Sequence, residues 1–394
     1  MSDIAASLPF LGVLLLLALL LGFLAGRRLL RPLRRLLPRR RAHNPVRGLN
    51  YLLNENPDDE IDALIAGFER QDGSLEAHLA LGKLLRRRGE SDRAIALHQR
   101  LLARPALDQE GRSRVELELA RDFLAAGLLN RAESLLAPLV GRKDGLGAAA
   151  LEVKLRLEER ERDWVAAART ARLLAKRGQG RFDRNIAHYQ CELAQEAWDV
   201  GDPELALSLL EDALRDEGNC VRATLLCGRI ELEAARYRDA CFALERVSQQ
   251  DPRFLPEALP ALVAAHHERG TERDLITFIE ACLEAHPSPA LAAYLAQTSG
   301  EDEGAESVRT AVAEALAKRP DMSGLDLLLG QYETSFEGPA AAALARLRAF
   351  SARLLADSDP YACDACGFSG PVLHWQCPRC RSWGTTAPRG GLFG

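Results

Sequence analysis

A turn that recurs at a nearly fixed spacing is the feature that most restricts the fold of this chain. From about Tyr51 to Ala356, amphipathic helical stretches alternate with short breaks containing Gly, Asp or Pro, and no strand-like alternation persists. The breaks follow one another at intervals of 34 to 39 residues. The turn residues are Gly89, Gly127, Arg162, Gly201, Ala235 and Gly270. Such a period predicts a stack of helix pairs, because an ordinary helical bundle does not repeat its turns.

Small residues around each turn explain how the two helices of one unit could approach closely. They are Gly82 before the first turn, Gly228 and Gly330 at the corresponding place in later repeats, and Ala94, Ala132, Ala167, Ala206 and Ala240 after the turns. Leu275, a larger residue, follows Gly270 in a weaker version of the same step. Glycine at the turn itself permits a left-handed backbone. Pro252, Pro287 and Pro320 recur at the ends of units, where proline stops a second helix.

The pattern resembles the tetratricopeptide repeat, a helix–turn–helix unit of about 34 residues. We therefore expect about eight units, some degenerate, over residues 49–356, and an all-α solenoid as the fold class. The first helices of such a solenoid line a concave groove.

Repeat position predicts which side chains face that groove and contact a partner. The predicted residues are Lys83, Arg86, Arg87, Arg114, Arg121, Arg156, Arg222 and Arg229, with His188, Gln195 and Trp198 farther along. A basic stripe on an acidic body would suit an acidic partner segment. The alternative is that these side chains are merely solvated.

An uncharged run of 19 residues, Leu8–Gly26, precedes the repeats. A helix of that length spans about 28 Å, close to the thickness of a hydrocarbon core. Positive charge follows the run, and none precedes it, which favours an uncleaved anchor over residues 1–26 rather than a signal peptide. The positive-inside rule then keeps the body of the chain cytoplasmic and places the short N-terminus on the other side.

Residues 27–48 form an arginine-rich linker between this anchor and the repeats. Nine arginines and one acid lie in the first 47 residues, so with a formal net charge of −5 the remainder carries −13. Arginines beside a membrane can contact anionic headgroups, which we favour over nucleic-acid binding.

Two C-x-x-C pairs near the end of the chain predict a metal site in residues 357–394. The cysteines are Cys363, Cys366, Cys377 and Cys380, and they span 18 residues. Four thiolates form the closed tetrahedral shell of a structural zinc site, and one zinc ion is our expectation. Iron in the same cage would give a rubredoxin-like electron carrier. Two disulfides are the remaining alternative, which a cytoplasmic location opposes.

No enzyme signature is complete in this sequence. There is no P-loop, and Gly178-Gln-Gly180 lacks a third glycine and a preceding strand. His266-His267-Glu268 lacks the spacing of a catalytic zinc site. We expect a protein that is not an enzyme.

The order of anchor, tetratricopeptide units and C-x-x-C-G-F … C-P-x-C tail resembles the lipopolysaccharide assembly protein B (LapB) family of Gram-negative bacteria. The segments NYLLNENP at 50–57, EAHL at 76–79 and IAHY at 186–189 also fit that family.

The resemblance implies a single-pass protein of the bacterial inner membrane, with a periplasmic N-terminus, that restrains lipopolysaccharide synthesis. It implies an adaptor that promotes degradation of the committed-step deacetylase of lipid A synthesis (LpxC) by the FtsH protease. It also implies contact with a periplasm-facing membrane regulator. A structural organiser of envelope enzymes without a protease is an alternative, and whether the chain forms a homodimer is left open.

Overall fold

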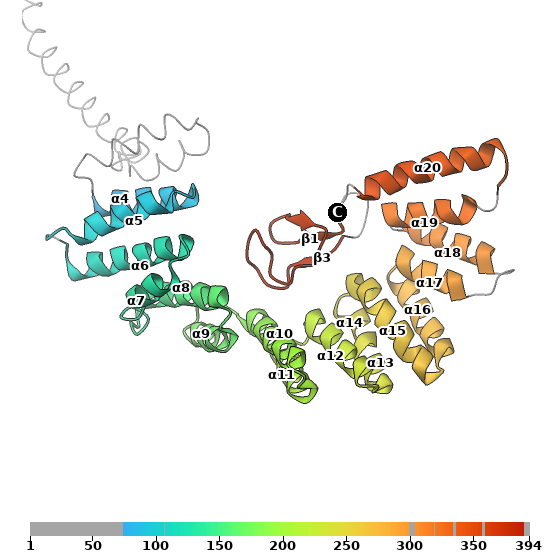
Figure 1. Cartoon of the computed structure of the whole chain (residues 1–394), viewed down its shortest axis with the longest axis horizontal. Coiled ribbons are helices and arrows are strands. Elements are labelled where there is room, and N and C mark those ends of the chain that lie inside the picture. The colour runs from blue at the N-terminus through green and yellow to red at the C-terminus, as the bar shows by residue number, and fades with distance from the viewer. Residues whose placement is uncertain are drawn as a thin grey trace, which may run out of the picture. The chain divides into compact units, whose positions relative to one another are not determined.

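The computed structural model describes residues 74–105, 107–298, 304–318, 320–333, 336–356 and 359–389 (Figure 1). The predicted anchor at 1–26, the linker at 27–48 and the first predicted repeat residues lie outside these ranges. Within the described ranges, no helix is both long enough and apolar enough to cross a membrane. The chain divides into two compact units, residues 1–132 and 133–394.

The first unit contains helices whose ends follow ordinary capping rules. They are α4 (Leu75–Arg87), α5 (Ser91–Leu102), α6 (Gln109–Ala125) and the start of α7 (Leu129–Leu136). The side chain of Ser74 accepts a hydrogen bond from the Ala77 amide and begins α4. Asp108 begins α6 in the same way by accepting from the Gly111 amide.

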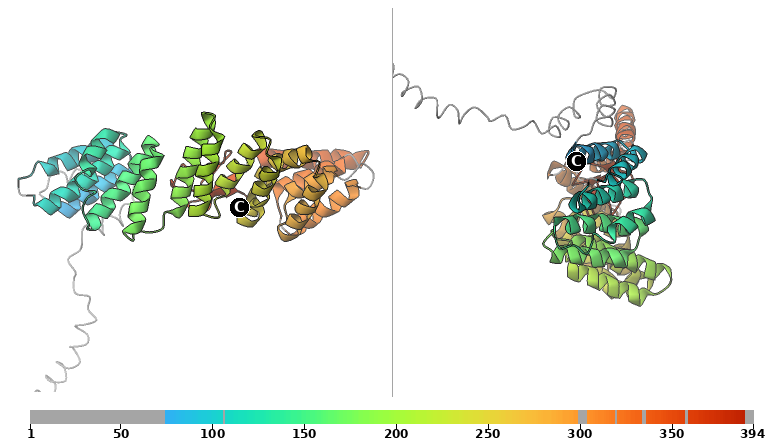
Figure 2. Two further views of the ribbon diagram at one scale, coloured as in Figure 1. Left: turned by 90° about the horizontal axis from the view of Figure 1, so that it is seen from below. Right: turned by 90° about the vertical axis from the view of Figure 1, so that its left-hand side faces the viewer.

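The second unit continues as helix pairs in chain order. Its helices are α8 (Gly145–Glu161), α9 (Trp164–Lys176), α10 (Asp183–Asp199), α11 (Pro203–Asp216), α12 (Val221–Glu233), α13 (Tyr237–Glu245), α14 (Val247–Gln250), η1 (Pro252–Phe254), α15 (Leu255–Arg269), α16 (Glu272–Ala285), α17 (Pro289–Thr298), α18 (Gly304–Lys318), α19 (Met322–Glu333) and α20 (Pro339–Ala356). Within each unit, consecutive pairs lie beside one another (Figure 2). The chain is therefore mostly helical, with tetratricopeptide-like pairs.

The predicted left-handed turns are confirmed at every position. Gly89, Gly127, Gly201 and Gly270 have φ values of 82°, 78°, 85° and 66°. Arg162 and Ala235 adopt the same conformation, with φ of 59° and 57°, although each has a Cβ that disfavours it. The repeat thus imposes one backbone geometry on the turn whatever residue occupies it.

The predicted close approaches are also present. Ala94, Ala132, Ala167, Ala206, Ala240 and Leu275 are all fully buried. A Cβ added to Gly228 would lie 2.3 Å from Leu244 in the partner helix. The helices α14, α16 and α18 end just before the predicted prolines Pro252, Pro287 and Pro320. Small residues and prolines therefore have the packing and stop roles that the sequence predicted.

A small antiparallel sheet follows α20. Its strands are β1 (Tyr361–Cys363), β2 (Ser369–Gly370) and β3 (Thr386–Pro388), in the order β2-β1-β3. Ala362 pairs with Ser369 on one side and with Ala387 on the other. Ala387 is also buried in the core cluster that contains Phe254 and Leu255, so this sheet shares a core with the repeats.

Candidate metal centre and its docking surface

The two C-x-x-C pairs form two turns of matching geometry. The Gly367 amide donates to the Cys363 carbonyl at 2.9 Å, and the Arg381 amide donates to the Cys377 carbonyl at 2.9 Å. Both residues that close the turns are left-handed, with φ of 69° at Gly367 and 61° at Arg381. Each turn points its two cysteine side chains toward the other turn, so the sequence spacing becomes a single site.

The four sulfur atoms converge as a metal cage requires. The Sγ atoms of Cys363 and Cys380 lie 3.7 Å apart, and those of Cys366 and Cys377 lie 3.6 Å apart. All four lie within 4.8 Å of one another. A tetrahedral zinc ion with Zn–S bonds of about 2.3 Å needs sulfur–sulfur edges of about 3.8 Å. The predicted ligands therefore fit one tetrathiolate-bound metal ion.

Hydrogen bonds favour the thiolate form of two of these cysteines. The hydroxyl and the amide of Ser382 hold the pKa of Cys380 at about 6, well below its ordinary value of 9.0. Burial raises the pKa of Cys363, but hydrogen bonds from Thr385 and from the Ala365 and Cys366 amides outweigh it, and the net pKa is lowered. Because the thiolate is the metal ligand, these bonds favour metal binding.

His374 is not part of the cage. Its ring lies 6.4 Å from the ring of Phe368, centroid to centroid. Among the described residues, Cys363, Cys366, Cys377 and Cys380 are the group of His, Cys, Asp and Glu side chains that converges closely enough to hold a metal ion. All four positions of a tetrahedral ion are then filled by protein, which is the pattern of a structural site.

Trp383 attaches the metal-binding domain to the helical repeats. Its side chain is only 4% exposed and lies edge-on to Trp164 and Tyr189, at centroid distances of 5.9 Å and 5.7 Å. The indole N–H donates to Oε1 of Glu159 at 2.8 Å, and the Tyr189 hydroxyl donates to the same oxygen at 2.6 Å. The Trp383 ring is thus both packed and hydrogen-bonded between α8, α9 and α10.

Trp375 forms a second anchor on a neighbouring part of the repeats. Its ring stacks on Phe254 of η1 at a centroid distance of 5.6 Å and an angle of 17°. His188 of α10 lies between the two tryptophans, 6.0 Å from Trp375 and 5.4 Å from Trp383. Trp375 and Trp383 flank the second cysteine pair, so the folded turn carries both anchors to the repeats.

Polar contacts surround these aromatic anchors. Arg253 Nη1 lies 3.2 Å from Oδ2 of Asp364, next to Cys363 in the sequence. The hydroxyl of Tyr361 donates to Oε1 of Glu257 at 2.5 Å. We call the set of Glu159, Trp164, His188, Tyr189, Arg253, Phe254 and Glu257 the docking surface of the repeats.

Gly384 lets the metal-binding domain approach α10 closely. A Cβ at this position would lie 2.5 Å from Nε2 of His188 and 3.3 Å from Cδ of Arg184. Its φ of +59° also disfavours any side chain. His188 is 4% exposed, and burial together with the charges of Arg222 and Arg184 lowers its pKa to about 3. His188 is therefore neutral near pH 7.

The structure locates the other predicted partner-binding residues of the second unit in varied settings. Gln195 donates to Oδ1 of Asp199 at 2.8 Å. Trp198 is partly buried against the α10–α12 core cluster. Arg222 is 7% exposed and bonds Glu192, whereas Arg156 and Arg229 are exposed. Partner binding by these residues stays a prediction, and His188 is the one that lies on the docking surface.

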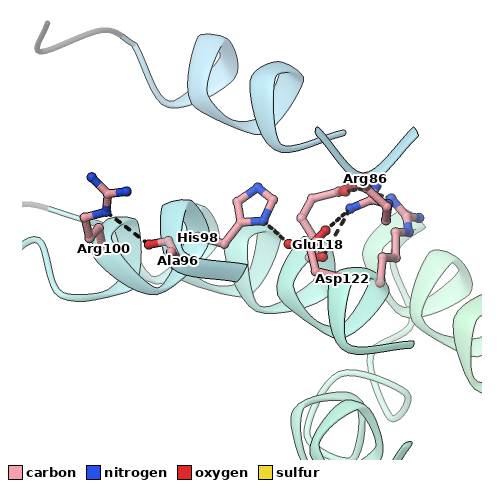
Figure 3. A network of polar contacts seen from close by, with 7 residues as sticks. Arg86, Ala96, His98, Arg100, Glu118 and Asp122 are labelled. Carbon is pink, nitrogen blue, oxygen red and sulfur yellow. Dashed lines mark hydrogen bonds and ion pairs between the residues drawn. The ribbon is translucent and has the colours of Figure 1, made fainter. Parts of the chain in front are cut away.

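In the first unit, some of the predicted basic residues belong to a partly buried polar network (Figure 3). Arg86 bonds Glu118 at 2.7 Å and Asp122 at 2.5 Å, while Arg121 pairs with Glu118. Nδ1 of His98 bonds Asp122, and both of these side chains are fully buried. Lys83 and Arg87 are exposed, and Arg114 pairs with Glu76. Partner binding by the residues of this set stays a prediction.

Sequence reasoning identified only His188 of the docking surface. The residues of that surface are spread from Glu159 to Glu257, and apart from His188 and Tyr189 in the IAHY segment none belongs to a pattern noted in the sequence. One signal was available: the chain has four tryptophans, and two of them flank Cys377 and Cys380 at nearly equal spacing. An apolar ring on each side of a metal knuckle is a surface that needs a partner to cover it.

Known proteins match both the metal-binding domain and the chain as a whole. Residues 361–388 match a family model described as the rubredoxin metal binding domain. Over 388 residues the chain is 31% identical to lipopolysaccharide assembly protein B of Escherichia coli strain K12, covering 98% of this chain and 100% of that protein. Identity to the protein of the same name from Haemophilus influenzae is 28% over 393 residues, covering 97% and 98%.

Among solved structures, the C-terminal part of a TPR repeat-containing protein from Cytophaga hutchinsonii covers 63% of this chain and 98% of its own. The TM-score is 0.36 and the identity 12%.

Proposed function

Because the chain belongs to the lipopolysaccharide assembly protein B family, we propose that it is a non-catalytic regulatory adaptor whose repeats bind protein clients. The family supports a role in lipopolysaccharide assembly. The observation that carries the adaptor proposal is the docking of Trp383 on Glu159 beside a cysteine cage with no open position. A closed cage attached to a repeat surface shapes that surface and offers no position for a substrate.

Cys363, Cys366, Cys377 and Cys380 would hold the metal ion, which we propose to be zinc. When bound, it supplies a structural cross-link between the two turns. Ser382 and Thr385 form hydrogen bonds with the sulfurs. Trp375 and Trp383 connect the turns to α8, α10 and η1. A domain of this size folds through its metal, because its own core is too small.

The finer proposal concerns the client. The repeats hold the committed-step deacetylase of lipid A synthesis (LpxC) and present it to the FtsH protease. The uncharged run at 8–26 would hold the repeats and their bound deacetylase at the inner membrane. This would raise the effective concentration of the deacetylase near the protease. What supports this proposal is the family match over the whole chain together with the arrangement of anchor, repeats and metal site.

The test is the half-life of the deacetylase in host cells depleted of this protein and complemented with variants. The wild-type chain should shorten the half-life. Cys377→Ser and Trp383→Ala should fail to do so, while Val372→Ala, at an exposed position of the same domain, should behave as wild type. If depletion leaves the half-life unchanged, the adaptor account is wrong. Co-purification of envelope enzymes without the protease would then favour a structural organiser.

Electron transfer is a second candidate function, favoured by the rubredoxin-type match and by the exposure of Cys380. Iron in a tetrathiolate cage absorbs visible light, whereas zinc does not. A colourless, zinc-filled protein that restores regulation would eliminate this candidate.

A further inference from the structure

Two free thiols, those of Cys191 and Cys220, lie against each other in the core of the second unit. Their Sγ atoms are 3.9 Å apart. Cys191 belongs to α10, and Cys220 is the residue directly before α12, so the two thiols come from successive helix pairs. Neither belongs to the cysteine cage of the metal site.

Cys220 is the more acidic thiol of the pair. The Cys191 thiol donates a hydrogen bond to its sulfur, and the Ala223 amide in the first turn of α12 donates another. These bonds outweigh burial and lower the pKa of Cys220. Burial and the hydrogen bond to Cys220 raise the pKa of Cys191. Because the thiolate is the nucleophile, we expect Cys220 to react first.

The other thiols outside the metal site lack this activation. Burial raises the pKa of Cys227 to about 12, and it also raises the pKa values of Cys241 and Cys282. Cysteines in the cage are metal ligands when the ion is bound. In the metal-loaded protein, Cys220 is therefore the thiol best prepared to act as a nucleophile.

The two thiols also differ in their access to solvent. Cys220 is 4% exposed and belongs to the lining of a cavity of about 310 Å³, together with residues of η1 and of the metal-binding domain. Cys191 has no exposed surface. A small oxidant that enters the cavity therefore meets Cys220, and Cys191 lies behind it.

We propose that Cys220 and Cys191 form a peroxide-sensitive thiol pair that closes to a reversible disulfide. The Cys220 thiolate attacks one oxygen of hydrogen peroxide, the O–O bond breaks, and hydroxide leaves, so that Cys220 becomes a sulfenic acid. The Cys191 sulfur then attacks the sulfenic sulfur and the S–O bond breaks. The hydroxyl group leaves as water with the proton of Cys191. Two electrons pass from the sulfurs to the peroxide in all.

The geometry of the pair suits this second step. Sulfur atoms in a disulfide are about 2.05 Å apart, so the two side chains must approach by only about 1.9 Å. The bond would link α10 to the start of α12, and α10 carries His188 and Tyr189 of the docking surface. In a reducing compartment such disulfides are transient, and thiol exchange would reopen this one.

This proposal does not depend on the regulatory function and is tested on the purified, metal-loaded full chain. Hydrogen peroxide is added in steps, and a non-reduced digest is analysed by mass spectrometry. A peptide that joins Cys191 to Cys220 should appear, should disappear after dithiothreitol, and should form with the metal content unchanged. The proposal is wrong if Cys191 and Cys220 are recovered unlinked at peroxide concentrations that already oxidise other thiols, or if they link only after the metal is lost.

Substitution of Cys191 tests the order of the two steps. In Cys191→Ser, the sulfenic acid of Cys220 has no partner, so its trapping by dimedone should rise at least about five-fold over wild type. Cys191→Ala should behave in the same way, and circular dichroism checks that both variants keep their helices. Unchanged trapping in a folded variant would contradict the proposed sequence of steps.

Cys227→Ser is the matched control. Cys227 lies in α12, seven residues after Cys220, and its raised pKa keeps it protonated. Its substitution should leave the rate of disulfide formation within about two-fold of wild type. Loss of the Cys191–Cys220 link in this variant would overturn the assignment of the pair.

Discussion

The indole N–H of Trp383 donates a hydrogen bond of 2.8 Å to Oε1 of Glu159, a residue 224 positions earlier in the chain. The same oxygen accepts the hydroxyl of Tyr189 at 2.6 Å. One carboxylate oxygen therefore joins the metal-binding domain to two successive helix pairs.

Truncation of the Trp383 side chain should release the metal-binding domain from the repeats. Trp383→Ala removes a buried ring and leaves Glu159 with one donor fewer, a loss of about 3–5 kcal/mol. Hydrogen–deuterium exchange should show lower protection in residues 361–388 and in α10, with metal content retained. Val372→Ala, at a 58% exposed side chain, is the control that should leave protection unchanged.

Metal removal should also release the metal-binding domain from the repeats. Trp375 and Trp383 are carried by the turn around Cys377 and Cys380, and that turn depends on the cage. A chelator should therefore abolish protection of residues 361–388 and change the tryptophan fluorescence, while the helicity of the repeats persists. Protection that survives complete metal loss would show that docking holds the turns without the cage.

Two turns of the repeat should respond in opposite directions to exchange of glycine and alanine. Ala235 has a φ of 57°, so Ala235→Gly relieves backbone strain and should raise the free energy of unfolding by up to about 1 kcal/mol. Gly201→Ala introduces that strain at a φ of 85° and should lower it by about 1 kcal/mol. A Cβ at Gly201 would meet no atom within 4 Å, so the effect is purely conformational. Chemical denaturation measures both, and shifts of the same sign would contradict the prediction.

Acid should weaken the contribution of His188. Its folded pKa of about 3 is below the ordinary value of 6.5, so at pH values between these the unfolded chain takes up a proton that the folded chain excludes. The contribution of His188 to the free energy of unfolding is complete above pH 6.5 and is lost as the pH falls toward 3.

His188→Gln isolates this effect, because glutamine does not titrate and proton competition for the cysteines acts on both proteins. The difference in unfolding free energy between wild type and His188→Gln should be larger at about pH 7.5 than at about pH 5.5. A constant difference would mean that His188 is not buried in its neutral form.

Local sequence predicted the repeat in detail because the repeat is a local structure. Gly89 and Gly201 provide left-handed turns, and Ala94 and Ala206 are buried five residues later, all inside one helix hairpin. Even the weak turn at Arg162 was predictable, since the period specifies its position when its own residue type disfavours the conformation.

The partly buried polar network of the first unit could not be predicted in this way. Arg86 was predicted to face a partner, yet it bonds Asp122, 36 positions away, and Asp122 in turn bonds His98. The period identifies the face of a helix on which a side chain lies. It does not reveal whether an acidic side chain on a neighbouring helix forms an ion pair with that residue.

The metal centre shows most clearly which features the sequence determined and which ones depend on tertiary structure. Sequence alone determined its ligands, because two C-x-x-C pairs ten residues apart can bring Cys363, Cys366, Cys377 and Cys380 to one point through local turns. Only the tertiary structure determined where that centre attaches. The contact of Trp383 with Glu159, Tyr189 and His188 depends on how separate helix pairs stack, and side chains so distant in sequence share no spacing from which their contact could be predicted.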